Sequence, residues 1–271
     1  MTDTPSVYVV LRECLRRSEP VGLATVVEGP GIGSKLLVRP GQAPLGSLGH
    51  SELSRVVARD ALAELEAGRT GTRTYGETGQ TIEIDEPDVQ SVRIFIESFA
   101  PPPRMVIFGA VDFTAALTRV AKVLGFSVTV CDARKVFATT RRFPLADEVV
   151  VDWPDRLLAR IGDELGSRDA VCILTHDPKF DVPAIQGALK TSVGYIGVMG
   201  SRATHERRMP RLFQAGITSD ADLARIFAPI GLDIGARTPE ETAVSICAEI
   251  IARRTKRHVP SLRDGEGPIH V

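Results

Sequence analysis

Short apolar runs alternate with amphipathic stretches across the second half of the chain. Continuous apolar runs are typical of parallel strands covered on both faces, and the intervening stretches have the length of crossover helices. We therefore predict an α/β fold with a Rossmann-like doubly wound parallel sheet, most simply in the strand order 3-2-1-4-5. The predicted strands are 105–110, 127–132, 148–152, 170–176 and 193–200, and the predicted helices between them include 115–124, 156–165 and 182–189.

The first hundred residues show shorter and more mixed patterns, which indicate a smaller α/β unit. The run of three prolines at 101–103 can neither continue a helix nor donate hydrogen bonds to a sheet, so it predicts a stiff connector. We expect an N-terminal domain over residues 1–100 and a Rossmann-like domain over residues 101–271. The N-terminal elements predicted are helices at 5–17 and 51–67 and strands at 21–27, 35–38, 81–84 and 92–98.

A later helix is predicted at 239–254, where Thr238 can cap the first turn and Pro239 suits its first position. We expect this helix to dock across one edge of the sheet. It begins within the glycine-containing segment 230–241. That segment either locks the helix onto the sheet or closes a cofactor cleft.

Charge and composition exclude several classes of function. The 33 basic and 34 acidic residues are interspersed and give a formal net charge of -1, so no global field would recruit nucleic acid or an anionic membrane. No apolar stretch approaches the length of a membrane span and the first residues show no secretory pattern, so we expect a cytoplasmic location. The four cysteines lie far apart, without zinc spacing, and Cys131 and Cys172 stand in apolar runs that predict buried, inert thiols.

Polar residues that follow the predicted strands are the candidates for a binding site, because ligands of such sheets bind at the carboxyl ends of the strands. Asp132 follows Gly109 at about the spacing at which an acid contacts a ribose hydroxyl, although aspartates also end strands where no ligand binds. The sequence singles out no catalytic residue and no metal ligand. The candidate cofactor-binding residues are Gly109, Asp132, Arg134, His176, Asp177, Gly200, Ser201 and Arg202.

The segment where a GxGxxG phosphate loop is expected lacks two of its three glycines, since it reads Gly-Ala-Val-Asp-Phe-Thr over residues 109–114. Val111 would hinder the close backbone approach of a pyrophosphate, and Asp112 places a negative charge at a helix N-terminus. Asp112 is more simply interpreted as a helix cap. NAD(P) binding is therefore expected to be weak.

Two turns could contact an anionic or pterin-like ligand. His176 could transfer a proton, contact a phosphate or hydrogen-bond to a pterin edge, or it could only order its loop. Residues 200–202 precede a predicted helix at 203–214 and offer amides, a hydroxyl and a guanidinium to an anion; the alternative is a capped helix start with a solvated arginine. The charged run 206–208 is expected to be a solvated helix face.

At these residues the sequence resembles the XdhC/CoxI family, the accessory proteins of xanthine dehydrogenase and related molybdenum hydroxylases. The resemblance implies binding of molybdenum cofactor (molybdopterin), support of its sulfuration, and its delivery to an apo molybdenum hydroxylase of the xanthine or carbon monoxide dehydrogenase type. It suggests a sulfurtransferase and a second copy in a homodimer as further partners, and it does not imply turnover of a purine. The matching stretches are 101–110, 128–134, 143–144 with 146–148, 175–181, 195–202 and 228–246.

The first half departs from the family pattern where that domain carries chemistry. The family stretch GSAPRRPG is reduced to Gly-Pro-Gly-Ile-Gly-Ser at 29–34, and SGGCVE becomes Ser-Leu-Gly-His-Ser-Glu at 47–52. These changes remove the cysteine that could bind molybdenum or carry sulfur. We expect a divergent member that acts as an accessory factor rather than a dehydrogenase. The alternatives are an NAD(P)-dependent oxidoreductase and a regulatory scaffold with a vestigial pocket.

Overall fold

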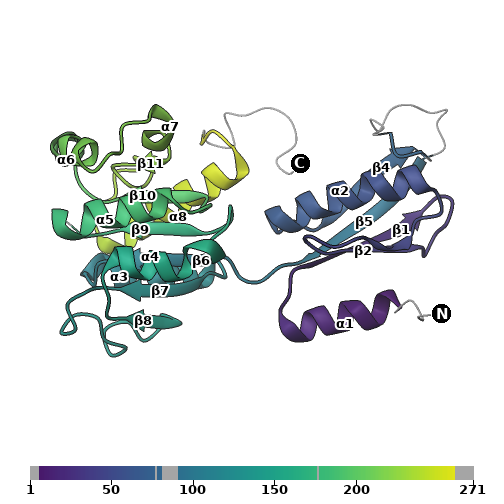
Figure 1. Cartoon of the computed structure of the whole chain (residues 1–271), viewed down its shortest axis with the longest axis horizontal. Coiled ribbons are helices and arrows are strands. Elements are labelled where there is room, and N and C mark those ends of the chain that lie inside the picture. Colours follow the sequence, from purple (N-terminus) through teal and green to yellow (C-terminus); the bar gives the residue numbers. More distant parts are fainter. Residues whose placement is uncertain (1–5, 77, 81–90, 176, 260–271) are drawn as a thin grey trace. The chain divides into compact units, whose positions relative to one another are not determined.

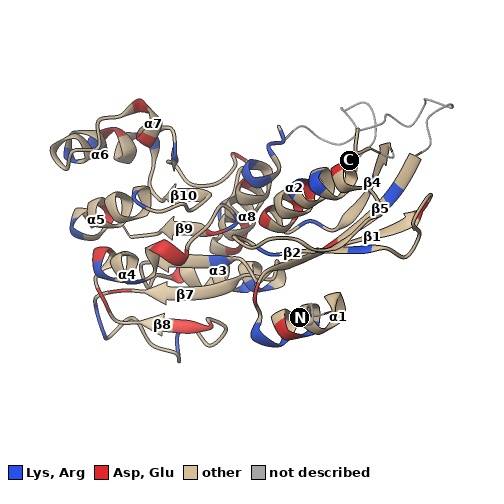
Figure 2. Ribbon diagram, turned by 45° about the vertical axis from the view of Figure 1, so that its right-hand side comes forward, with Lys and Arg blue, Asp and Glu red and all other residues tan. Residues whose placement is uncertain are grey.

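The chain folds into two compact units, Met1–Pro101 and Pro102–Val271, as seen in a computed structural model that describes residues 6–76, 78–80, 91–175 and 177–259 (Figure 1). The strand predicted at 81–84 lies outside the described residues. Within the described part of the chain, no helix is long and apolar enough to cross a membrane. Acidic and basic residues are interspersed along the elements of both units (Figure 2).

The first unit is an antiparallel sheet in the order β3-β2-β1-β5-β4, with one helix packed on each face. Side chains alternate along β1: Val21 and Leu23 pack with α1, whereas Ala24 and Val26 pack with α2, as the two-residue period of a strand requires. The elements are α1 (Val7–Arg17), β1 (Val21–Glu28), β2 (Lys35–Val38), β3 (Leu45–Ser47), α2 (Ser51–Ala67), β4 (Gly71–Gly76) and β5 (Ser91–Phe99).

The second unit is a six-stranded parallel sheet in the order β11-β10-β9-β6-β7-β8. This arrangement confirms the predicted Rossmann-like order 3-2-1-4-5 and adds β11 as a sixth strand at the edge next to β10. The elements are β6 (Arg104–Phe108), α3 (Asp112–Val123), β7 (Ser127–Cys131), β8 (Glu148–Val150), α4 (Pro154–Ile161), a 3-10 turn η1 (Gly162–Glu164), β9 (Ala170–Ile173), α5 (Pro178–Leu189), β10 (Tyr195–Val198), α6 (Arg202–Gln214), α7 (Asp220–Leu223), β11 (Ile226–Phe227) and α8 (Pro239–Thr255).

Two apolar layers enclose this parallel sheet. One layer joins α3 and α8 to the sheet through side chains such as Leu117, Ile246 and Ile107, and the other joins α4, α5 and α6 to the opposite face. The prediction that α8 docks across an edge of the sheet is therefore wrong. Its buried residues, including Cys247 and Ile250, point at the face shared with α3, because β6 and its neighbours expose apolar side chains on both faces.

Buried Glu249 fixes α8 to the sheet and to the segment that precedes it. Its Oε2 accepts hydrogen bonds from the Tyr195 hydroxyl at 2.6 Å and from the Gly231 amide at 2.9 Å. Burial and the nearby Glu249 carboxylate keep the pKa of Tyr195 well above its ordinary value. Ser245 Oγ also donates to the Leu232 carbonyl, and Thr238 caps the helix in a capping box. The segment 230–241 thus anchors α8, one of the two roles considered for it.

We expect Glu249→Ala to destabilise the chain by about 2–4 kcal/mol, because it leaves the buried Tyr195 hydroxyl and the Gly231 amide without an acceptor. The matched control is Glu240→Ala on the same helix, where the exposed carboxylate pairs with exposed Arg119 and the cost should stay below about 1 kcal/mol. Urea denaturation followed by circular dichroism measures both values. Equal destabilisation by the two substitutions would contradict the anchoring role.

Candidate functional site

The carboxyl ends of the parallel strands bring most of the predicted site residues to one edge of the sheet. Gly109 follows β6, Asp132 follows β7, Asp177 follows β9 and Gly200 follows β10. Because β10, β9, β6 and β7 are consecutive in the sheet and parallel, these residues share an edge. His176 lies outside the described residues.

Asp132 is a buried carboxylate whose hydrogen-bonding capacity is taken up by neighbouring protein groups. Oδ2 accepts from the Ala110 amide at 2.8 Å and from Arg134 Nη2 at 2.8 Å, while Oδ1 accepts from the Arg134 amide and Nε, each at 2.9 Å. Burial acts to raise the pKa of Asp132, but the hydrogen bonds from Arg134 and Ala110 outweigh it and hold that pKa below its ordinary value. A ribose hydroxyl would have to displace one of these donors, since a carboxylate has about four acceptor positions.

Gly109 stands where the loop after β6 passes close to the loop after β9. Its φ of +108° is favoured only by glycine, and a Cβ atom would lie 2.9 Å from the Thr175 amide nitrogen. Val111, not Asp112, is the N-cap of α3, and no side chain caps this helix. The interpretation of Asp112 as the cap is thus wrong: it is the first helical residue, and its exposed carboxylate lies 3.6 Å from Arg142.

Asp177 caps α5 by accepting a hydrogen bond from the Lys179 amide at 3.0 Å. One turn further along, Asp181 forms a buried ion pair of 3.1 Å with Arg208 of α6. Arg208 Nη2 also donates to the Met199 carbonyl at 2.9 Å, next to the Gly200 turn. Arg208 therefore ties the first turns of α5 to the end of β10.

The prediction that residues 206–208 form a solvated helix face is wrong for Arg208, which is only 4% exposed, although Glu206 and Arg207 are exposed. The burial of Arg208 could not be predicted from the charged run, because a buried arginine needs a partner and this partner is distant in the sequence. Here the partner, Asp181, is 27 residues away.

The turn at 200–202 has the geometry of a capped helix start. Gly200 has a φ of +137°, and Ser201 Oγ accepts from the Thr204 amide at 3.1 Å. The Arg202 guanidinium lies 3.6 Å from Asp233, and both side chains are more than four-fifths exposed. Such an exposed ion pair contributes little, so Arg202 can exchange its partner at small cost.

All four cysteines are buried and lack partners for disulfide formation. Burial raises the pKa of Cys131 and of Cys247 to about 12, and it raises the pKa of Cys172 well above its ordinary value. The described residues also contain no group of three or more His, Cys, Asp or Glu side chains that could hold a metal ion. The described residues therefore offer molybdenum neither an exposed thiol nor a cluster of carboxylates.

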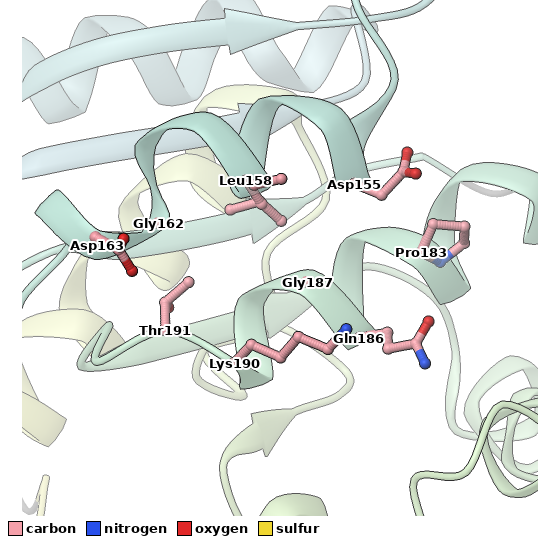
Figure 3. A pocket seen from close by; sticks show the side chains of 10 residues that line it. Asp155, Leu158, Gly162, Asp163, Pro183, Gln186, Gly187, Lys190 and Thr191 are labelled. Atoms are coloured by element: carbon pink, nitrogen blue, oxygen red, sulfur yellow. The ribbon is translucent and has the colours of Figure 1, made fainter.

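A cavity of about 200 Å³ lies between α4 and α5, where no residue was predicted to bind a ligand (Figure 3). The two helices pack closely because Gly187 has no side chain; a Cβ atom there would lie 2.8 Å from Leu158 Cδ1. Sequence reasoning could not find this cavity, since it depends on how two helix surfaces meet. Its lining residues are Asp155, Leu158, Ala159, Gly162, Asp163, Pro183, Gln186, Gly187, Lys190 and Thr191.

Two family models match this chain. The model described as the XdhC Rossmann domain matches residues 105–250, which include all the strand ends described above. The model described as the XdhC and CoxI family matches residues 14–76 in the first unit.

Individual relatives show the same likeness. A probable xanthine dehydrogenase subunit of Bacillus subtilis (strain 168) is 33% identical over 66% of this chain and 51% of its own length. The molybdenum cofactor insertion chaperone PaoD of Escherichia coli (strain K12) is 26% identical over 59% of this chain and 43% of its own length. An uncharacterized protein, YqeB, of the same Escherichia coli strain is 25% identical over 89% of this chain and 44% of its own length. The matched stretch is thus about half or less of each relative.

A crystal structure of a xanthine dehydrogenase from Bacillus halodurans shares the fold, with a TM-score of 0.52 and 21% identity over 92% of this chain and 96% of that one. At this level of identity the likeness supports the architecture alone.

We expect Asp132→Asn to lower stability at pH 7 by about 2 kcal/mol, because a neutral amide cannot replace the charge-assisted acceptor of Arg134. The pKa of Asp132 is lowered in the folded chain, so its contribution is complete above the unfolded pKa of about 3.9 and is lost as pH falls through the folded value. The difference between wild type and Asp132→Asn in the free energy of unfolding, measured by urea denaturation, should therefore become smaller as the pH falls from about 5 towards 3. Asp112→Asn, at an exposed position, should leave the free energy of unfolding close to that of wild type at pH 5 and at pH 3.

We expect the thiols of the native chain to resist modification. At pH 8, fewer than one thiol per chain should react with 5,5′-dithiobis(2-nitrobenzoic acid) within minutes, because burial shields all four sulfur atoms and raises the pKa of Cys131, Cys172 and Cys247. In guanidinium chloride all four should react. Rapid modification of a thiol in the native chain would contradict the burial described here.

Proposed function

Because this chain belongs to the XdhC and CoxI family, we propose that it is an accessory factor that binds molybdenum cofactor and delivers it to an apo molybdenum hydroxylase of the xanthine or carbon monoxide dehydrogenase type. The observation that carries this proposal is the match of the XdhC Rossmann domain across residues 105–250, the part that contains the polar sheet edge. The likeness to a molybdenum cofactor insertion chaperone supports the same role. The proposal includes no turnover of a purine by this chain.

The residues at the sheet edge fit the anionic, organic part of the cofactor. The turn at Gly200 and Ser201 opens α6, whose first amides have no acceptor within the helix and favour a phosphate. Beneath this turn, buried Arg208 has one nitrogen, Nη1, without a hydrogen-bond partner among the described residues. The exposed Arg202 adds a second positive charge near this turn. We assign the phosphate end of the cofactor to this turn.

The molybdenum itself would supply the chemistry of the client enzyme when the cofactor is bound there. Since the described residues provide no cluster of metal ligands, this chain would hold the cofactor through its pterin and phosphate groups. Sulfur for its sulfuration would then come from a separate sulfurtransferase, because the four cysteines of this chain are buried. His176 and Asp177 remain predicted contacts of the cofactor; Asp177 stands at the N-cap of α5.

The NAD(P)-dependent alternative is disfavoured by the loop after β6. Val111 occupies the N-cap of α3, where a dinucleotide-binding loop needs glycine for close approach of the pyrophosphate. Asp132, which would contact a ribose, already accepts four hydrogen bonds from protein groups. We therefore expect calorimetry to give weaker binding for NADPH and NADH than for molybdenum cofactor.

We expect Arg202→Ala to weaken binding of purified molybdenum cofactor by roughly ten- to a hundredfold, because it removes a charge-assisted contact to the phosphate. Arg211→Ala is the matched control: it removes the same charge from an exposed position at the opposite end of α6. Titration calorimetry on variants with equal thermal stability measures both affinities. Equal affinities in wild type and Arg202→Ala would reject the phosphate assignment, and failure of the wild type to bind would favour the vestigial scaffold.

A further inference from the structure

Three strand ends of the second unit bring aromatic and basic side chains together beside Asp132. Arg134 and Phe137 lie in the loop that follows β7, Trp153 is the N-cap of α4 after β8, and Phe180 lies in the first turn of α5 after β9. None of the three aromatic residues was singled out by the sequence. We refer to Arg134, Phe137, Trp153 and Phe180 as the stacking platform.

The members of this platform form a continuous row. The guanidinium carbon of Arg134 lies 4.5 Å from the centre of the Phe137 ring and 6.0 Å from that of Phe180. The Phe180 and Trp153 ring centres are 5.0 Å apart. Arg142 extends the row, because its guanidinium carbon lies 5.6 Å from the Phe137 ring. A surface that alternates rings with guanidinium groups is suited to planar, electron-rich or anionic groups.

Asp132 holds the Arg134 guanidinium in a fixed plane through two parallel hydrogen bonds, from Nε and Nη2. Bidentate pairing removes most of the rotational freedom of the arginine before a ligand arrives, so less entropy is lost on binding. The buried carboxylate therefore acts as a support for the platform. This supporting role explains why Asp132 stands at the strand end although its oxygens already accept hydrogen bonds from Ala110 and Arg134.

The platform is open to solvent although it is rich in aromatic surface. Phe137 is 38% exposed, Trp153 is 39% exposed, and the Arg134 side chain is 46% exposed. Val136, at 75% exposure, extends the apolar surface beside Phe137. Exposed aromatic residues at the carboxyl ends of parallel strands mark a binding surface, because ligands of such sheets bind there.

We propose that this platform binds a planar nitrogen heterocycle that carries an anionic group. The rings and guanidinium planes offer stacking surfaces, and the loop from 134 to 142 carries four basic residues. The pterin ring of the cofactor and the base of a nucleotide both have this chemistry. The inference rests on the proposed function in that it assigns the heterocycle end of the ligand to the platform and leaves its phosphate at the Gly200 turn.

Trp153 is the sole tryptophan of the chain, so its fluorescence reports on the platform directly. The experiment titrates the full-length chain separately with 6-carboxypterin, with cytidine monophosphate and with guanosine monophosphate, and confirms each affinity by calorimetry. We expect saturable quenching of Trp153 below about 1 mM by at least one probe. Quenching by the pterin alone identifies the pterin ring as the occupant, and quenching by a nucleotide alone identifies a base. No saturable binding of any probe overturns the proposal.

Variants locate the binding. Phe137→Leu should lower the affinity for the probe that quenches Trp153 by about fivefold or more. Arg134→Lys should lower it as well, although it keeps the charge, because lysine lacks the planar group. The control is Phe213→Leu, which replaces a phenylalanine of similar exposure at the far end of α6. Circular dichroism and thermal melting show that each variant is folded. Equal affinities in Phe137→Leu and Phe213→Leu overturn the platform.

The same variants separate this inference from the proposed function. If wild type binds molybdenum cofactor and Phe137→Leu binds it equally well, the platform is rejected and the accessory role stands. If wild type fails to bind molybdenum cofactor but binds a heterocycle probe in a manner that depends on Phe137, the platform stands and the cofactor assignment is rejected.

Discussion

Parallel pairing throughout the sheet from β8 to β11 is the constraint on which the second unit depends. Parallel strands need a crossover between each pair, so helices must cover the sheet, and both faces of β6 and β9 must be apolar. The two separate apolar layers follow from this requirement. So does the location of the candidate site, because all six strands end at the same edge and deliver their loops to it.

The same constraint explains which parts of the structure the sequence could predict. Long apolar runs in the middle of the sheet predicted β6, β7, β9 and β10 correctly. The sequence missed β11, which has two residues, and β3 and β4, which are short or polar edge strands whose pairing depends on neighbours. The position of α8 was wrong because its caps determine where the helix begins but not the surface it covers; that surface was set by buried contacts such as Glu249 with Tyr195.

Residue types at the sheet edge were predictable, but their partners were not. The spacing from Gly109 to Asp132 identified a strand-ending acid, whereas only the structure places its carboxylate against Ala110 and Arg134. Arg208 and Asp181 were hidden for the same reason, since their ion pair joins two helices that are remote in the sequence. At this edge the structure therefore shows paired arginines, whereas all four cysteines of the chain are buried.

The close approach of Gly109 to the Thr175 backbone has a kinetic consequence. A Cβ atom could not fit between the two loops, so no group of a ligand can enter between β6 and β9 at that point. Cargo held at this edge would lie on top of the strand ends, with one side facing outwards. A ligand that is only shallowly buried dissociates faster. Its outward face would also let an acceptor protein make contact before the ligand has left. Under the proposed function, such a geometry would suit transfer from one protein to another better than long-term storage.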